Sequence, residues 1–158
     1  MSLKNEIQKL AMFLEGKKHV SIEHVLEVVP RTRPENIFAL SRAIGQQNLS
    51  SALLCLTHLL EDHQSEIGVL ALVIRHIRIL SRVKEGIMRK YSKKALCELV
   101  GVPSFFIQNY IEEAGMWTEA NIRSAVEQLK ITDEALKSSS LPPSLWLERF
   151  IIKTCVLY

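Results

Sequence analysis

The strongest hydrophobic pattern in the chain runs from residue 66 to residue 90, and it predicts one long helix. Its first half is apolar on nearly every side, which is typical of a helix that other helices surround. Its second half, read at 3.6 residues per turn, separates an apolar face from a cationic face. The apolar face carries Ile77, Leu80, Val83 and Ile87. The opposite face carries Arg75, Arg78, Arg82 and Arg89. We expect these four arginines to face water or a partner, and they form the candidate partner interface.

Shorter amphipathic patterns before and after this stretch predict further helices. They cover residues 3–14, 21–29, 35–45, 50–63, 93–101, 105–115, 119–137 and 144–158. Residues suited to cap a helix N-terminus precede several of them, namely Asn48 or Ser50, then Ser92 and Thr118. Only 6 Gly, 5 Pro and 6% aromatic residues are present, which disfavours a sheet with tight turns. The sequence therefore predicts an all-α protein built as a helical bundle.

Two prolines, Pro30 and Pro34, mark the clearest break in the chain. Proline lacks an amide donor and biases the preceding residue away from helix. The two helices predicted before this break are too short to bury their apolar faces alone. We therefore expect a small unit at residues 1–33 and a helical bundle domain at residues 34–158.

The positive charge of the chain is concentrated in one window. Residues 75–94 hold eight Lys or Arg against Glu85 alone, although the whole chain of 158 residues has a net charge of only +3. Such a window suits nucleic acid, an acidic protein surface or plain solvation. The 3 cysteines are far apart in apolar patterns, and no segment resembles a signal peptide or a membrane span. We expect reduced thiols in a soluble, cytoplasmic protein.

No motif in the sequence is arranged for catalysis. Paired acids such as Glu112 and Glu113 lie in helical patterns where neighbours point about 100° apart, so we expect them on solvated faces. His58 and His63 are not at the spacing that places two imidazoles on one metal ion, and no glycine-rich phosphate loop is present. We therefore expect no catalytic residue, no metal, no cofactor and no enzymatic activity.

The segment 92–114 matches the spacing of a helix-turn-helix, with Cys97 at the small buried position, Gly101 in the turn and Ile107 inside the second helix. The residues that would point outward from the second helix are Ser104, Phe105, Gln108, Asn109, Glu112 and Glu113. Two acids without Lys or Arg make a poor reader of DNA, so a helical corner inside a bundle is favoured. The alternative is a free-standing nucleic-acid-binding module that uses this segment or the basic window 75–94.

Taken in order, the sequence resembles the C-terminal part of the delta subunit of bacterial DNA polymerase III, a component of the sliding-clamp loader. No single motif carries this resemblance, which rests on the ordered series from Asn5 to about Ile152. The matching stretches are NEIQKLAMFL, SIEHVLEVV, RPENIFALSRAIGQQNLSSALLCLTHLL, IRHIRILSRVKEG, ALCELVGVPSFFIQNYI and ITDEALKSSSLPPSLWLERFII.

The resemblance implies a fold and a role for each part of the chain. Residues 1–33 would hold the last two helices of the lid, a small AAA+-like domain, and residues 34–158 would form the collar domain. A collar assembles clamp-loader subunits into a ring, so the expected partners are subunits of the tau/gamma and delta-prime types. In the family, the contact that opens the clamp lies in an N-terminal domain that this sequence does not include. We expect a non-catalytic assembly module for DNA replication, with at most weak or indirect contact to DNA and no contact with a membrane.

Overall fold

The computed structural model describes residue 12 and residues 34–156. The helices predicted at 3–14 and 21–29, and with them the two-helix remnant of a lid domain, lie outside the described residues apart from Met12, which is helical. The described residues 34–156 belong to one compact unit. The domain boundary after residue 33 stays a prediction.

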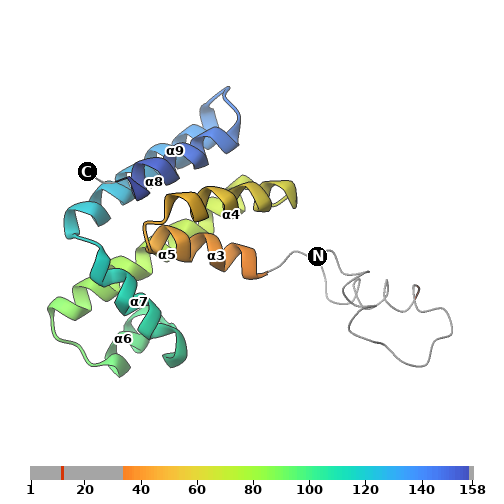
Figure 1. Cartoon of the computed structure of the whole chain (residues 1–158). Helices are drawn as coiled ribbons and strands as arrows, with labels where there is room; N and C mark the ends of the chain where they lie inside the picture. The colour runs from red at the N-terminus through yellow and green to blue at the C-terminus, as the bar shows by residue number, and fades with distance from the viewer. Residues whose placement is uncertain (1–11, 13–33, 157–158) are drawn as a thin grey trace. The chain divides into compact units, whose positions relative to one another are not determined.

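The described part of the chain contains helices and no strand, so the predicted all-α class is confirmed (Figure 1). The helices are α3 (Pro34–Gly45), α4 (Leu49–Glu61), α5 (Glu66–Met88), α6 (Lys93–Val100), α7 (Ser104–Met116), α8 (Glu119–Ser138) and α9 (Pro143–Cys155). Each corresponds to one of the amphipathic patterns in the sequence, because a helix must place its apolar stripe on one side to bury it.

Side-chain caps explain where several of these helices begin. Asn48 Oδ1 accepts from Ser51 N at 3.0 Å, Ser92 Oγ accepts from Ala95 N at 3.3 Å, and Thr118 Oγ1 accepts from Asn121 N at 3.1 Å. Each bond satisfies an amide that has no partner inside the helix. The predicted caps at Ser92 and Thr118 are confirmed, and of the two candidates before α4 the structure uses Asn48.

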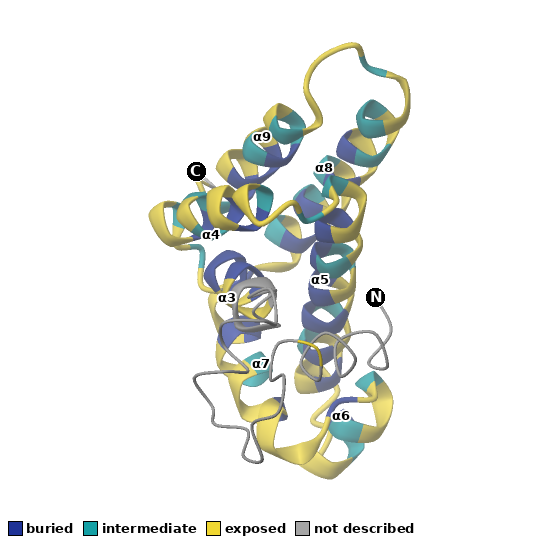
Figure 2. Ribbon diagram, turned by 90° about the vertical axis from the view of Figure 1, so that its right-hand side faces the viewer, coloured by how far each residue is buried: buried dark blue, intermediate teal, exposed yellow. Residues whose placement is uncertain are grey.

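Helix α5 is the central element of the bundle. It packs against α3, α6, α7, α8 and α9. In both views the pair α8 and α9 lies at one end of the bundle and α6 at the other, while α5 carries buried residues along much of its length (Figure 2). Ile77, Leu80 and Val83 are fully buried as predicted. Ile87 is 37% exposed, because it lies in the last turn of α5, where Gly86 rather than Ile87 faces Leu96 of α6.

Helices that are neighbours in sequence also pack on each other. Helix α4 follows α3 and packs on it, and α9 follows α8 and packs on it. Between α6 and α7 the chain turns at Gly101, whose φ of 66° lies in the left-handed region that glycine adopts without strain. This short turn brings α7 back against both α6 and α5.

Candidate partner interface and pocket

The four arginines of the predicted interface are all exposed in the structure. Arg75, Arg78 and Arg82 follow one another along α5, and Arg89 directly follows its last residue, Met88. Arg89 Nη2 lies 2.6 Å from Glu85 Oε1, and Arg82 Nη1 lies 3.5 Å from Leu99 O. The first two arginines have no ion-pair partner among residues 34–156. This geometry fits the predicted cationic face, while its role as an interface stays a prediction.

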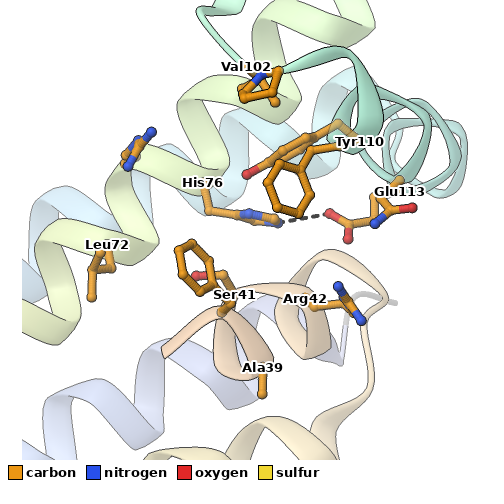
Figure 3. A pocket seen from close by; sticks show the side chains of 13 residues that line it. Ala39, Ser41, Arg42, Leu72, His76, Val102, Tyr110 and Glu113 are labelled. Carbon is orange, nitrogen blue, oxygen red and sulfur yellow. Dashed lines mark ion pairs between the residues drawn. The ribbon is translucent and has the colours of Figure 1, made fainter. Parts of the chain in front are cut away.

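One end of this arginine row lies at a pocket of about 540 Å³ between α3, α5 and α7 (Figure 3). Helix α5 contributes Leu72, Arg75 and His76. The remaining wall comes from α3, from the turn before α7, and from α7 itself: Phe38, Ala39, Ser41, Arg42, Val102, Pro103, Phe106, Asn109, Tyr110 and Glu113. Its lining is mainly apolar, with a few polar groups at defined places, which is the usual make-up of a ligand pocket.

The wall of the pocket contains a buried pair of titratable side chains, His76 from α5 and Glu113 from α7. His76 Nε2 lies 2.9 Å from Glu113 Oε2, and each side chain is only 7% exposed (Figure 3). Neither atom has another hydrogen-bond partner in the described part of the chain. Burial of two such groups is tolerated because each partly compensates the other.

The expectation that Glu113 lies on a solvated, outward face of its helix is therefore wrong. Helix α7 turns its buried side toward α5, and that side includes Ile107, Ala114 and Glu113. Glu113 comes three residues after Tyr110, which places both on nearby parts of one helix face, and both line the pocket. An acid on a helix is usually solvated, so its residue type alone did not indicate burial. The helical spacing from Tyr110 was the available signal.

Tyr110 completes the polar part of the pocket wall. Its ring lies 5.2 Å from the His76 ring, measured between centroids. Burial raises the pKa of the Tyr110 hydroxyl; the Glu113 carboxylate adds to this rise, and Arg75 opposes it. The hydroxyl is therefore a neutral donor and acceptor at ordinary pH.

The end of α3 fits closely against this pair. A Cβ on Gly45 would lie only 2.8 Å from His76 Nε2 and still closer to the Glu113 carboxylate. Glycine is thus needed here for a close approach between the end of one helix and side chains from two others. The helix predicted from the sequence ends at residue 45, and no local pattern indicates this close approach.

The helix-turn-helix-like segment forms a corner of the bundle. Ile107 is buried and Gly101 lies in the turn, as predicted, while Cys97 is half-buried rather than buried. The exposed residues among those expected to face outward are Ser104, Phe105, Gln108, Asn109 and Glu112. No Lys or Arg lies within α7, so the corner presents no cation from this helix to a phosphate backbone.

Neither a metal site nor a membrane span is found in the part of the chain that the structure describes. Among those residues, no three His, Cys, Asp or Glu side chains lie close enough to hold a metal ion. None of the described helices is long and apolar enough to cross a bilayer. Cys55, Cys97 and Cys155 are free thiols.

Comparison with known proteins assigns this architecture to a family. The chain matches the family described as DNA polymerase III delta subunit, C-terminal domain, over residues 34–154. It therefore belongs to that family, and the matched region covers most of the chain and all of the described helices except the last residue of α9.

Two relatives from Bacillus subtilis illustrate the match. The DNA polymerase III subunit delta of strain 168 is 26% identical over 152 residues, which cover 96% of this chain and 44% of the relative. The solved structure of the Bacillus subtilis DNA clamp loader delta protein (YqeN) matches with a TM-score of 0.70 and 25% identity, over 96% of this chain and 44% of that one. The chain thus spans less than half of the length of these relatives, and both names describe a delta subunit and not a polymerase catalytic chain.

Proposed function

We propose that this chain is the non-catalytic assembly part of a clamp-loader delta subunit that acts in DNA replication. In this proposal, residues 34–158 form a collar that holds the clamp-opening subunit in the loader by packing helix faces against subunits of the tau/gamma and delta-prime types. The clamp itself is contacted elsewhere in the subunit. Membership in the delta family and resemblance to a clamp loader delta protein support this role.

The observation that carries the interface is the row of exposed arginines Arg75, Arg78 and Arg82 on α5, with Arg89 at its end. Helix α5 contacts five other helices, so the row stands on a rigid platform and loses little freedom when it binds. Guanidinium groups form forked, charge-assisted hydrogen bonds with carboxylates. A neighbouring subunit with acidic residues on its facing helix would suit this row.

Charge reversal of Arg75, Arg78 and Arg82 to Glu tests the interface. The protein, in its natural full-length form, is mixed with the other loader subunits and separated by gel filtration over a series of salt concentrations, alongside thermal melts. We expect the variant to lose complex while its melting temperature stays unchanged. A matched triple, Lys93, Lys94 and Lys130 to Glu, makes the same charge change at exposed sites outside the row. Unchanged complex in the arginine variant at every salt concentration would overturn the interface.

A nucleic-acid-binding module that uses the basic window 75–94 or the corner 92–114 is the competing function. Helix α7 gives the corner no cation, and Glu113 is buried against His76 instead of facing a groove. These observations favour a protein partner over DNA for this surface.

A further inference from the structure

The pocket between α3, α5 and α7 has a composition that plain packing of the bundle does not require. Phe38 and Phe106 line the pocket, and 63% and 45% of their surfaces are exposed. Exposing large aromatic surface costs free energy in water, and apolar surface gathered around a concave site is typical of a binding site. A volume of about 540 Å³ has room for one or two bulky side chains of a ligand.

The charged side chains at the pocket indicate that its ligand carries negative charge. Arg42 and Arg75 line it from α3 and α5, both are exposed, and neither has an ion-pair partner among residues 34–156. Glu113 is the one carboxylate among the lining residues, and it lies against His76. Two unpaired cations therefore flank an apolar floor, and they complement a ligand that carries carboxylates beside an apolar side chain.

The buried part of the wall leaves these two arginines as the exposed charges of the pocket. His76 and Glu113 are more than nine-tenths buried and lie against each other, with His76 Nε2 2.9 Å from Glu113 Oε2. The one carboxylate of the lining therefore has its neighbour within the wall, and a ligand meets the charges of Arg42 and Arg75.

The geometry points to a docking site for an acidic peptide segment of a partner protein, in which a bulky apolar side chain enters the pocket and neighbouring carboxylates pair with Arg42 and Arg75. The apolar side chain lies against Phe38, Phe106 and Leu72. This inference goes beyond the proposed assembly role, although the two share Arg75. Arg42 belongs only to the pocket, and Arg78 and Arg82 belong only to the proposed interface, so the two roles can be tested separately.

A display library of random twelve-residue peptides, selected on the whole chain, supplies the probe. The selection includes a counter-selection on the variant Ala39→Trp, which fills the pocket from an exposed position on α3. We expect the enriched peptides to carry Asp or Glu within two positions of Leu, Ile, Phe or Trp. Their fluorescein-labelled forms are then titrated by fluorescence anisotropy.

Matched variants decide whether the pocket is the site. We expect Arg42→Glu and Arg75→Glu each to weaken binding tenfold or more, and Arg78→Glu, one turn further along α5, to weaken it less than threefold. A peptide with its acids changed to Lys should regain affinity for Arg42→Glu, an effect that loss of folding cannot produce. Four results would each overturn the proposal. Two concern binding: the enriched peptides lack acids, or they bind Ala39→Trp as well as the unchanged protein. The other two are equal effects of Arg75→Glu and Arg78→Glu, and displacement of the peptide by an oligothymidylate.

Discussion

The indole of Trp117 donates a hydrogen bond from Nε1 to the carbonyl oxygen of Gly45, with 2.7 Å between the two atoms. Gly45 is the last residue of α3. Trp117 directly follows the last residue of α7, and only 1% of its surface is exposed. The preceding carbonyls of α3 accept from backbone amides of the next turn, at Gln46, Gln47 and Asn48. A helix leaves its last four carbonyls without partners inside the helix, so Trp117 completes the C-terminus of α3 from a distant part of the chain.

The first prediction concerns this bond. Trp117→Phe keeps an aromatic ring but leaves Gly45 O buried without its donor, so we expect the free energy of unfolding to fall by about 1–3 kcal/mol. Trp146→Phe is the matched control, because Trp146 Nε1 has no hydrogen-bond partner among the described residues, and we expect it to cost about 1 kcal/mol or less. Urea unfolding followed by circular dichroism measures both. Equal costs for the two variants would contradict the role of the bond.

The second prediction concerns the space that Gly45 leaves for the pair on α5 and α7. A Cβ there would lie 2.8 Å from His76 Nε2, so we expect Gly45→Ala to reduce the free energy of unfolding by about 1–3 kcal/mol. The same Cβ would lie even closer to the Glu113 carboxylate. The cost should therefore become smaller in a Glu113→Ala background, where this nearest group is absent and His76 has room to move.

A matched glycine supplies the control for that experiment. Gly115 is an exposed residue of α7, and a Cβ added to it meets nothing within 4 Å. Gly115→Ala should therefore stabilise the protein by about 0.4–1 kcal/mol, because alanine restricts the unfolded chain. Urea denaturation of the single and double variants measures all of these values. A cost for Gly45→Ala that persists undiminished without Glu113 would show that the backbone of α3, and not the close approach, sets it.

The third prediction concerns residues that adopt the left-handed backbone conformation without being glycine. His63, just after α4, has a φ of 55°, and Gln47 and Lys90 have similar values. A side chain at such a position is strained by contact between its Cβ and the backbone. We expect His63→Gly to stabilise the protein by about 0.5–1 kcal/mol. Lys130→Gly, in the middle of α8, should destabilise it by about 1 kcal/mol. A loss of stability in His63→Gly would contradict the strain at this position.

The fourth prediction concerns pH. Burial raises the pKa of the Cys155 thiol from 9.0 to about 11. Between these values the unfolded chain has lost the thiol proton and the folded chain retains it, so the free energy of unfolding falls as pH rises through this window. Below about pH 9 the contribution is present in full. Urea unfolding of wild type and Cys155→Ala from about pH 8 to 11 isolates it, because other titrating groups such as Tyr110 are common to both. Parallel pH profiles for the two proteins would contradict the prediction.

The helices were predictable because their signals are local. Periodic apolar residues and capping side chains such as Ser92 and Thr118 lie within a few positions of the element that they define. The exposure of Arg75, Arg78 and Arg82 followed from the same periodicity, since an apolar face on α5 requires an opposite polar one.

The pocket was not predictable, because it depends on which helices meet. His76, Glu113 and Gly45 come from three helices, and no local pattern states that these helices converge at one point. Glu113 illustrates the difficulty: an acid on a helix is usually solvated, and only a histidine on a facing helix makes its burial acceptable. Trp117 is similar, since its partner lies at the end of a helix far away in the sequence.

The last prediction is that DNA binding by this chain is weak and comes from the basic window alone. Helix α7 exposes Gln108 and Glu112, whose side chains bond to each other at 3.0 Å, and offers no cation. We expect dissociation constants of about 10⁻⁴ to 10⁻⁶ M for duplex DNA near physiological salt, the usual range for binding to phosphates without sequence readout. Gln108→Ala should leave this affinity unchanged, and Lys93→Glu with Lys94→Glu should reduce it severalfold. Fluorescence anisotropy with labelled duplexes of two unrelated sequences, repeated over a salt series, measures these effects. Tight binding to one duplex that falls on changing Gln108 would instead show that α7 reads DNA.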